Sequence, residues 1–251
     1  MQPTQRFSKT IDFYHRYRPS YPTELIDLLA ELVSLTPNAH IADIGAGTGK
    51  LTTLLLDKGY EVWAVEPNDA MREFAINWLA SNPRFHASAG KAEATTLAQG
   101  QFDLITAAQA FHWFDLTAFR QECLRLLKPN AQVALIWNER SNDTDPAMAA
   151  YEALIQSYSI DYRKVHDQWV NPTQLADFFQ NTYTTASFPY THYLDLEGFK
   201  GRYRSCSYAL DTTHPDYLEA MHQLEQLFNQ FAVNDQLGMQ YNSVVYYGQL
   251  T

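Results

Sequence analysis

Short apolar runs alternate with amphipathic segments over residues 40–138, which is typical of a parallel β-sheet with crossover helices. The runs are short and apolar throughout, which suits strands that are covered on both faces. The predicted strands are IADI (41–44), EVWAV (61–65), RFHASA (84–89), FDLITA (102–107) and QVALIW (132–137). The predicted helices cover about 49–58, 69–80 and 116–127, and the last of them ends before Pro129.

The segments that flank this core follow other patterns. Residues 22–35 predict an amphipathic helix opened by Pro22, and an irregular aromatic and basic arm precedes it. After a polar loop at 138–148, helical patterns recur at about 147–159, 173–180, 197–209 and 215–231. The strand-like segments are 182–196, in which Pro189 favours an edge or bulged position, and the terminal YNSVVYYGQL. No flexible linker interrupts the chain, so we expect a single domain over 1–251.

Composition narrows the class of protein. With 46% apolar residues the chain can bury a full core, and its formal net charge of −10, with no Lys or Arg run, disfavours a nucleic-acid partner. The two cysteines, Cys123 and Cys206, match no metal spacing and no disulfide framework, so we expect no metal. The N-terminus has no apolar signal core and no run is long enough to span a bilayer, so we expect a cytoplasmic protein without membrane association. The oligomeric state does not follow from the sequence.

The stretch HIADIGAGTGKLT (40–52) places three glycines directly after a predicted strand and before a predicted helix. A phosphate-binding P-loop is excluded, because Gly45 is one residue too close to the Gly49–Lys50 pair and Leu51 replaces the metal-binding hydroxyl. The dinucleotide pattern G-x-G-x-x-G is also incomplete, since Lys50 stands where its third glycine belongs. The loop nevertheless predicts a close approach of the backbone to a ligand.

Two carboxylates support a nucleoside as that ligand. Glu66 ends the second predicted strand, roughly 20 residues after the first glycine, where a carboxylate accepts hydrogen bonds from both ribose hydroxyls. Asp43 lies at the end of a buried strand, where desolvation of a charge needs compensation. Asp43 would either organise the amides of the loop or pair with an ammonium group of the ligand. The alternative is a structural, N-cap-like aspartate.

Four segments in register, ADIGAGTGKLT, VWAVEPNDAMRE, GKAEATTL and FDLITAAQAFHWFD, resemble the motifs of class I S-adenosylmethionine-dependent methyltransferases. YHRYRPSYP and AQAFHWFD are also similar to small-molecule methyltransferases of the trans-aconitate methyltransferase type, whereas the chain beyond 140 resembles that branch mainly in layout. The resemblance implies an α/β, doubly wound, mostly parallel seven-stranded sheet with helices on both faces, an antiparallel last strand and helical insertions that form a cap. It divides the domain into a lid arm and helix (1–36), a cofactor-binding core (37–139), and cap helices with the final strands (140–251).

The resemblance also implies roles for single residues around the cofactor S-adenosylmethionine and its product S-adenosylhomocysteine. The glycine loop would contact the methionine part, Glu66 the ribose, and Arg18 either the methionine carboxylate or an anionic substrate. Pro67, Met71, Ala92 and Glu93 would surround the adenine, Gln109 and Ala110 would lie beside the methionine, and His112 and Trp113 would close the floor. The predicted cofactor-binding residues are Asp43, Gly45, Ala46, Gly47, Gly49, Glu66, Pro67, Met71, Ala92, Glu93, Gln109, Ala110, Trp113 and Arg18.

We therefore expect transfer of a methyl group to a small molecule, such as a carboxylate, by in-line displacement without a metal. A carboxylate needs no general base, and the candidates for a base, His112, Tyr14 and His15, carry little support. Arg202 and Arg204 with Arg18 would suit an acidic substrate, although solvated helix charges explain them as well. Aromatic and basic residues expected to line the cap are Tyr158, Tyr162, Trp169, Tyr203, Arg204 and Tyr208. An NAD-linked oxidoreductase, which the missing third glycine disfavours, and a catalytically silent cofactor-binding protein are the alternatives.

Overall fold

The computed structural model describes residues 11–34, 36–141, 145–160, 162 and 171–251. One sheet of seven strands, in the order β3-β2-β1-β4-β5-β7-β6, forms its centre. The strands are β1 (His40–Ile44), β2 (Glu61–Val65), β3 (Phe85–Ser88), β4 (Phe102–Ala108), β5 (Leu127–Arg140), β6 (Thr184–Leu194) and β7 (Leu237–Gly248). Strands β1 to β5 pair in parallel, and β7 is antiparallel to both β5 and β6. The predicted fold class, including the antiparallel last strand, is confirmed.

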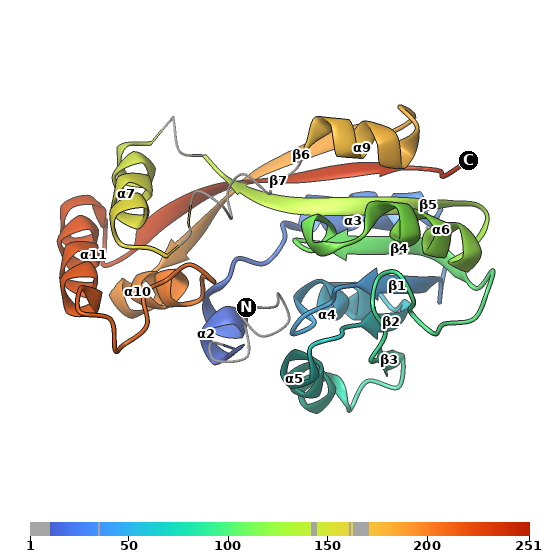
Figure 1. The fold of residues 1–251 in the computed structure, drawn as a ribbon, viewed down its shortest axis with the longest axis horizontal. Coiled ribbons are helices and arrows are strands. Elements are labelled where there is room, and N and C mark those ends of the chain that lie inside the picture. The colour runs from blue at the N-terminus through green and yellow to red at the C-terminus, as the bar shows by residue number, and fades with distance from the viewer. Residues whose placement is uncertain (1–10, 35, 142–144, 161, 163–170) are drawn as a thin grey trace.

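Helices cover both faces of the sheet. On one face, α3 (Thr23–Leu32), α4 (Lys50–Asp57) and α5 (Asp69–Leu79) bury Leu25, Leu55 and Leu79 against Ile41 and Val62. On the other face, α6 (Leu116–Leu126) and α9 (Pro172–Phe179) pack together through stacked rings of Phe119 and Phe178. Helix α9 falls within the segment that the sequence assigns to the cap, but it lies on the sheet beside α6 (Figure 1).

A second lobe forms where β5, β6 and β7 extend beyond the shorter strands (Figure 1). It contains α7 (Pro146–Ser157), α10 (Leu196–Arg204) and α11 (Tyr217–Phe231), packed around Tyr151, Phe199 and Leu224. Strand β5 begins earlier and ends later than the apolar run 132–137 predicts. Its first residue, Leu127, pairs with Phe102 of β4, and its last residues, 138–140, pair with β7 beyond the buried centre. Pro189 lies in β6, an edge strand, as expected.

Helix α2 (Ile11–Tyr17) lies between the second lobe and the helices of the sheet domain (Figure 1). Its Tyr17 ring is buried on α10, where a Cβ added to Gly201 would lie 2.3 Å from Tyr17 Cδ2. On the other side His15 packs edge-on against Trp78 of α5, and its Nδ1 lies 3.4 Å from the Thr48 hydroxyl. The N-terminal arm is therefore held by both parts of the molecule.

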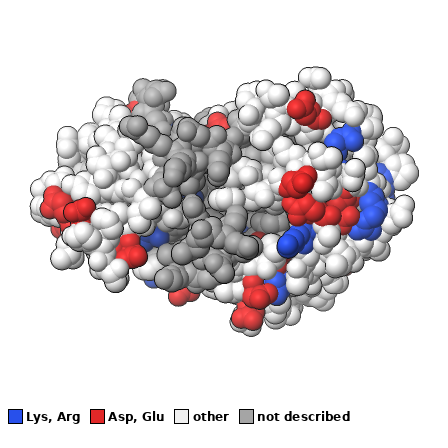
Figure 2. Space-filling model, viewed as in Figure 1, with Lys and Arg blue, Asp and Glu red and all other residues white. Residues whose placement is uncertain are grey.

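The described residues include no helix that is both long and apolar enough to cross a membrane. On the face shown in Figure 2, the Lys and Arg side chains over the sheet domain lie among Asp and Glu and do not form a continuous basic surface.

We expect Gly201→Ala to destabilise the docking of α2, because the new methyl group overlaps the Tyr17 ring. The cost should be about 1–3 kcal/mol, the usual range for overpacking a buried contact. In a Tyr17→Ala background the same substitution should cost less than about 0.5 kcal/mol, so the two changes are not additive. Urea unfolding of the four proteins measures the coupling, and additive changes would show that Tyr17 does not occupy the space above Gly201.

Candidate functional site

Two adjoining pockets open at the carboxyl ends of β1, β2 and β4, where open α/β sheets bind ligands. We call them the glycine-loop pocket, which contains Gly47, Glu66 and Met71, and the arginine pocket, which contains Arg18, Arg140 and Arg202. The residues common to both are Tyr14, Gly45, Ala108, Gln109 and Trp113. The two pockets therefore form one continuous site.

The glycine loop is shaped by backbone conformations that favour glycine. Gly45, Gly47 and Gly49 have φ values of +71°, +59° and +83°. A Cβ on Gly45 would lie 2.6 Å from Ala110 Cβ, whereas a Cβ on Gly47 would have only Met71 Sδ within 4 Å, at 3.9 Å. Gly47 thus exposes backbone to the pocket. Gly49 is the N-cap of α4 and lines neither pocket, so its predicted contact with the cofactor is not apparent from its position.

Glu66 connects the end of β2 to this loop. Its Oε2 accepts the amide of Gly47 at 2.9 Å, and its Oε1 accepts the amide of Asn68 at 2.8 Å. Burial raises the pKa of Glu66, and the two amides partly oppose that shift. Each carboxylate oxygen keeps a further lone pair, so the side chain can hold the loop and still accept a donor from a ligand.

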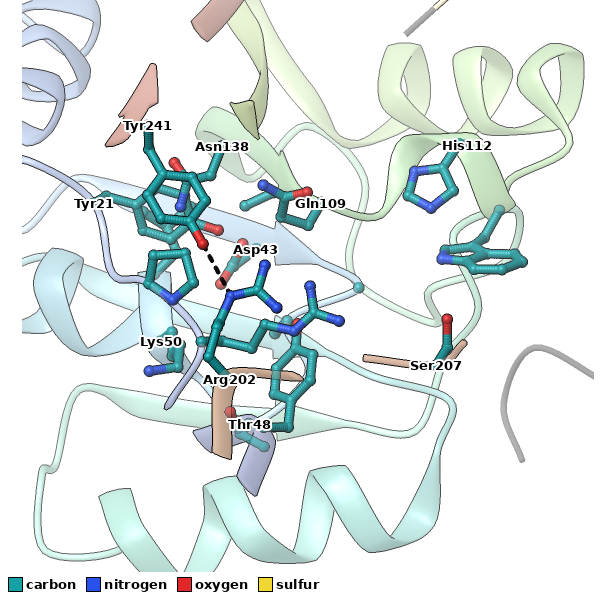
Figure 3. Close-up of a pocket in the computed structure, with 18 of the residues that line it drawn as sticks. Tyr21, Asp43, Thr48, Lys50, Gln109, His112, Asn138, Arg202, Ser207 and Tyr241 are labelled. Carbon is teal, nitrogen blue, oxygen red and sulfur yellow. Dashed lines mark hydrogen bonds between the residues drawn. The ribbon is translucent and has the colours of Figure 1, made fainter. Parts of the chain in front are cut away.

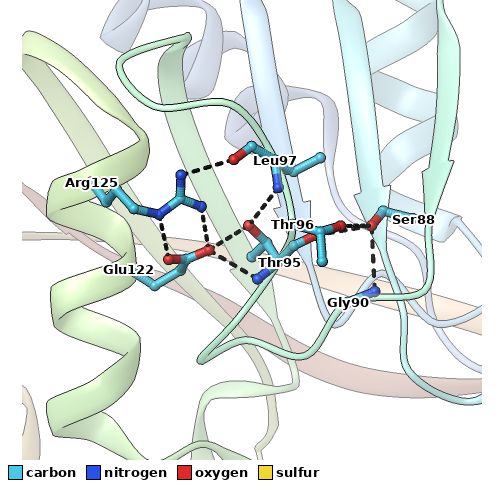
Figure 4. A network of polar contacts seen from close by, with 7 residues as sticks. All are labelled: Ser88, Gly90, Thr95, Thr96, Leu97, Glu122 and Arg125. Atoms are coloured by element: carbon cyan, nitrogen blue, oxygen red, sulfur yellow. Dashed lines mark hydrogen bonds and ion pairs between the residues drawn. The ribbon is translucent and has the colours of Figure 1, made fainter.

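The opposite wall of the glycine-loop pocket is the segment Lys91–Glu93, which a polar network anchors to α6 (Figure 4). Glu122 accepts both the amide and the hydroxyl of Thr95, at 2.9 and 2.6 Å, and Arg125 donates to the carbonyl of Leu97 at 2.8 Å. Arg125 beside it lowers the pKa of Glu122 to about 2. Glu93 accepts the amide of Asp115 at 2.8 Å, which ties the same segment to the start of α6.

Asp43 lies on the floor of the arginine pocket and is 1% exposed. Its two carboxylate oxygens accept the hydroxyls of Thr52 at 2.7 Å and Thr106 at 2.9 Å. Burial raises the pKa of Asp43 to about 6, although the two hydroxyls lower it. Among the described residues, no amide of the glycine loop donates to Asp43, which supports the loop instead through Thr52 of α4 and Thr106 of β4.

Gln109 separates the two pockets with a strained backbone. It follows β4 and has φ +57°, a conformation that side-chain-bearing residues rarely adopt. Its amide donates to the carbonyl of Ile136 at 2.9 Å, which fixes the turn on the neighbouring strand. Such strain is typical of functional sites, where surrounding contacts hold the chain in place.

Four cations from distant segments line the arginine pocket, namely Arg18, Lys50, Arg140 and Arg202. Figure 3 shows Lys50 and Arg202 in the pocket. Arg140 ends β5 and binds Glu152 at 2.7 Å, and Arg202 donates from Nε to the Tyr241 hydroxyl at 2.9 Å. Arg18 lies over the Tyr14 ring and donates to the carbonyl of Ser205 at 3.1 Å. Burial, with Arg18 nearby, lowers the pKa of Lys50 to about 8.

The charges of this pocket do not balance. Asp43 is its single carboxylate lining residue among the described residues, against four cations. Buried guanidinium atoms also lack hydrogen-bond partners within the described chain: Nε of Arg18, and Nε and Nη1 of Arg140. Buried donors are normally satisfied, so these atoms point to an anionic ligand.

The three candidates for a general base differ in position. Tyr14 lines both pockets, and burial raises its pKa. His112, in the 3-10 turn Phe111–Trp113, lines the arginine pocket, and burial lowers its pKa to about 4. His15 lines neither pocket, since its ring packs against Phe74 and Trp78.

Most of the predicted cofactor residues lie on these walls. The glycine-loop pocket contains Gly45, Gly47, Glu66, Pro67, Met71, Ala92, Glu93, Gln109, Ala110 and Trp113, and the arginine pocket adds Arg18, Asp43 and Ala46. Among the expected cap residues that the structure describes, only Tyr208 lines either of these two pockets, while Arg204 binds Tyr217 and Glu197 away from the site. Tyr162 binds Arg140, the hydroxyl of Tyr203 bonds the carbonyl of Tyr158, and Trp169 lies outside the described residues.

Sequence reasoning missed Lys50, Asn138, Arg140 and Tyr241. In the sequence, Lys50 is visible only as the residue that replaces the third glycine of the dinucleotide pattern. A signal for Arg140 was present, since it lies three residues beyond the apolar run 132–137, near the carboxyl end of a buried strand, as Glu66 does. Tyr241 offered no local signal, because it depends on the pairing of β7 with β5.

Comparison with known proteins identifies relatives for this arrangement. Residues 42–135 match the family model described as a methyltransferase domain. An uncharacterized methyltransferase of Mycobacterium tuberculosis is 38% identical over 134 residues, which are 53% of this chain and 52% of that protein. A Dictyostelium discoideum protein named as a methyltransferase is 32% identical over 186 residues, 70% of this chain and 67% of that protein. The chain thus aligns with about half the length of its mycobacterial relative.

Solved structures share the fold at lower identity. A protein described as a methyltransferase of an antibiotic biosynthesis pathway in Anabaena variabilis has a TM-score of 0.61 and 20% identity, with 94% of this chain and 100% of that chain covered. A protein described as a type II methyltransferase from Anaeromyxobacter dehalogenans has a TM-score of 0.60 and 20% identity, with 93% and 98% covered.

We expect Asp43→Asn to change how stability depends on pH. Because burial raises the pKa of Asp43 from 3.8 to about 6, the folded protein keeps a proton there that the unfolded chain has released. Raising the pH from 4 to 6.5 should therefore destabilise the wild type relative to the variant by about 2 kcal/mol. Urea unfolding across this range tests it, with Asp57→Asn on the exposed end of α4 as control. Parallel curves for wild type and Asp43→Asn would contradict the assignment.

Proposed function

Because this chain belongs to the class I S-adenosylmethionine-dependent methyltransferases, we propose that it transfers the methyl group of that cofactor to a small acceptor that carries a carboxylate. One observation carries the proposal: a single site joins a half with a loop-bound carboxylate, Glu66, to a half with excess positive charge. We also propose that the chain belongs to the trans-aconitate methyltransferase-like branch, on the strength of its N-terminal arm and the AQAFHWFD segment.

The glycine-loop pocket suits the nucleoside part of the cofactor. Ribose hydroxyls are donors, and Glu66 has acceptor capacity beyond its bonds to Gly47 and Asn68. Pro67, Met71 and Ala92 offer apolar surface to the adenine. Gly47 has no side chain between the backbone and this space.

The amino-acid part of the cofactor would lie where the two pockets meet. Asp43 and the paired cations Arg18 and Lys50 provide opposite charges for its ammonium and carboxylate groups. Burial lowers the pKa of Lys50, and the nearby guanidinium of Arg18 lowers it further, so an anion between the two cations would relieve their repulsion. S-adenosylmethionine, when bound, supplies the electrophilic methyl group on its sulfonium.

The acceptor would occupy the rest of the arginine pocket. Arg202 hydrogen-bonds to no carboxylate of the described chain, so an acidic acceptor would supply a buried guanidinium with the anion it lacks. A carboxylate is already ionised at neutral pH and needs no base, and the pKa of about 4 keeps His112 uncharged there. The role of the chain is then to position the acceptor oxygen and to exclude water.

The direct test has two parts. Titration calorimetry with S-adenosylmethionine, S-adenosylhomocysteine and NAD should show micromolar binding of the two adenosyl compounds and none of NAD. Small carboxylic acids and their amides are then screened with a labelled methyl donor, and the acids should be methylated. Methylation of the amides alone would overturn the acidic acceptor, and cofactor binding without turnover on any compound would indicate a catalytically silent protein.

We expect Glu66→Ala to weaken cofactor binding by about 1.5–3 kcal/mol, which is roughly 10- to 150-fold, because a charged hydrogen-bond acceptor is lost. Glu61→Ala, at the opposite end of β2, should leave the affinity unchanged. Calorimetry with S-adenosylhomocysteine measures both. Equal affinities for wild type and Glu66→Ala would remove the ribose assignment.

We expect Arg202→Met to lower kcat/KM for an acid acceptor by at least about 30-fold, since a desolvated charge pair is lost. The affinity for S-adenosylhomocysteine should remain within about twofold. Arg204→Met is the matched control, because Arg204 lies two residues away and binds Glu197 and Tyr217 away from the pocket. A loss of the same size in both variants would show that the effect is structural.

A further inference from the structure

Arg202 is a buried arginine whose closest possible anion is a thiol. Its Nη1 lies 2.8 Å from the Sγ of Cys206, four residues along the chain. Its Nε donates to the hydroxyl of Tyr241, and no carboxylate of the described chain bonds to it. Arg140 in the same pocket differs, because Glu152 supplies its counter-charge at 2.7 Å. A buried guanidinium without an anion is costly, and the Cys206 sulfur is close enough to supply that anion.

The two cysteines of the chain have opposite surroundings. Cys123 lies in the apolar core on α6, and burial raises its pKa well above the usual range. Cys206 is also buried, which opposes ionisation, yet Arg202 and Arg18 with Arg140 lower its pKa to about 7. A thiolate at this position would lie within the field of three arginines.

We propose that the Cys206 thiolate is the internal counter-ion of Arg202, and that an acidic acceptor displaces its charge so that Cys206 takes up a proton when the acceptor binds. This inference rests on the acidic acceptor proposed above. Cys206 is thus a positioning residue, which acts on the acceptor through Arg202. The unpartnered guanidinium atoms of Arg18 and Arg140 independently indicate that the pocket receives an anion.

Charged and titratable groups face Cys206 from every side. They are Arg202 and Tyr203 of α10, Arg18 of the arm, Arg140 of β5, Tyr151 of α7 and Tyr208 after α10. Burial raises the pKa values of Tyr151, Tyr203 and Tyr208, so these phenols stay neutral near pH 7. Below pH 7 the thiol leaves Arg202 free to bind a carboxylate. Above it, the thiolate competes with the acceptor.

The first test measures the thiolate without methyl donor or acceptor. Absorbance at 240 nm, followed from pH 5 to 9, should show a single thiolate that forms near pH 7 in wild type and in Cys123→Ser. The signal should be lost in Cys206→Ser, and its midpoint should rise by at least about one unit in Arg202→Met, where the neighbouring charge is gone. Absence of a thiolate below pH 8.5 in the wild type would overturn the proposal. Cys206→Ala is a second variant, and thermal unfolding checks that both fold.

The second test measures the exchange of anions, with succinate as the acid and succinamide as its neutral counterpart. Millimolar succinate should raise the midpoint of the Cys206 thiolate, and succinamide should not. The affinity for succinate should fall by up to about tenfold from pH 6 to 8 in wild type and Cys123→Ser, because the competent thiol form becomes rare. The fall should be absent in Cys206→Ser. Asp43 and Lys50 also titrate near this range, but all variants retain them, so the difference isolates Cys206.

An unshifted midpoint with succinate, or the same pH profile in wild type and Cys206→Ser, would overturn the exchange. These readouts require no turnover. If the Cys206 thiolate forms and succinate displaces it, but no acid is methylated, the proposed function fails and the ion pair of Cys206 with Arg202 stands. If acids are methylated but no thiolate forms, the proposed function stands and the ion pair fails.

Discussion

The antiparallel pairing of β5 with β7 is the constraint on which the site depends. Its register runs from Val133 opposite Gly248, inside the sheet, to Arg140 opposite Tyr241, at the start of the second lobe. Strand β7 then contributes Met239 and Leu237 to the core around α7, α10 and α11. A single pair of strands thus belongs to both hydrophobic cores, and the arginine pocket lies where the strands pass from one core to the other (Figures 1 and 3). A slip of one residue would turn Arg140 to the opposite face and remove it from the pocket.

This placement explains how the chain accommodates so much buried positive charge. Tyrosines from several elements surround the guanidinium groups, with Tyr241 bonded to Arg202 and Tyr162 to Arg140. Neutral hydroxyls satisfy donors but supply no charge, so they lower the cost of burying arginine only in part. Glu152 balances Arg140, while Asp43 is occupied by two threonine hydroxyls. Stability does not account for the remaining charge excess, because an apolar side chain in these places would cost the fold less, and the acidic acceptor that we propose would account for it.

The sequence was sufficient for features that depend on neighbouring residues. Strand periodicity located β1, β2 and β4, and the spacing from the glycine loop to Glu66 located one wall of the site, because each strand end is fixed by its own local pattern. Features that depend on distant pairing were not accessible. Glu122 supports the Lys91–Glu93 wall through Thr95, 27 residues away, and Arg202 meets Tyr241 across 39 residues. Glu122 and Arg202 are polar residues of helices, and such residues are equally compatible with a solvated surface. Only the fold shows that they are buried at the site.

The position of helix α2 depends both on its own residues and on elements that are distant in the sequence. With seven residues it is too short to be stable alone, so its position rests on contacts with other elements. Tyr17 reaches α10 only because Gly201 has no side chain, and His15 reaches α5 through Trp78. Tyr14 of this helix and Arg18 directly after it line the arginine pocket, so these contacts and the bond from Arg18 to the Ser205 carbonyl hold the arm at the site. The part of the pocket wall that the N-terminal arm supplies therefore depends on both lobes. Strands β5 and β7 join the lobes, and α10 of one lobe and α5 of the other hold the short helix α2 from opposite sides.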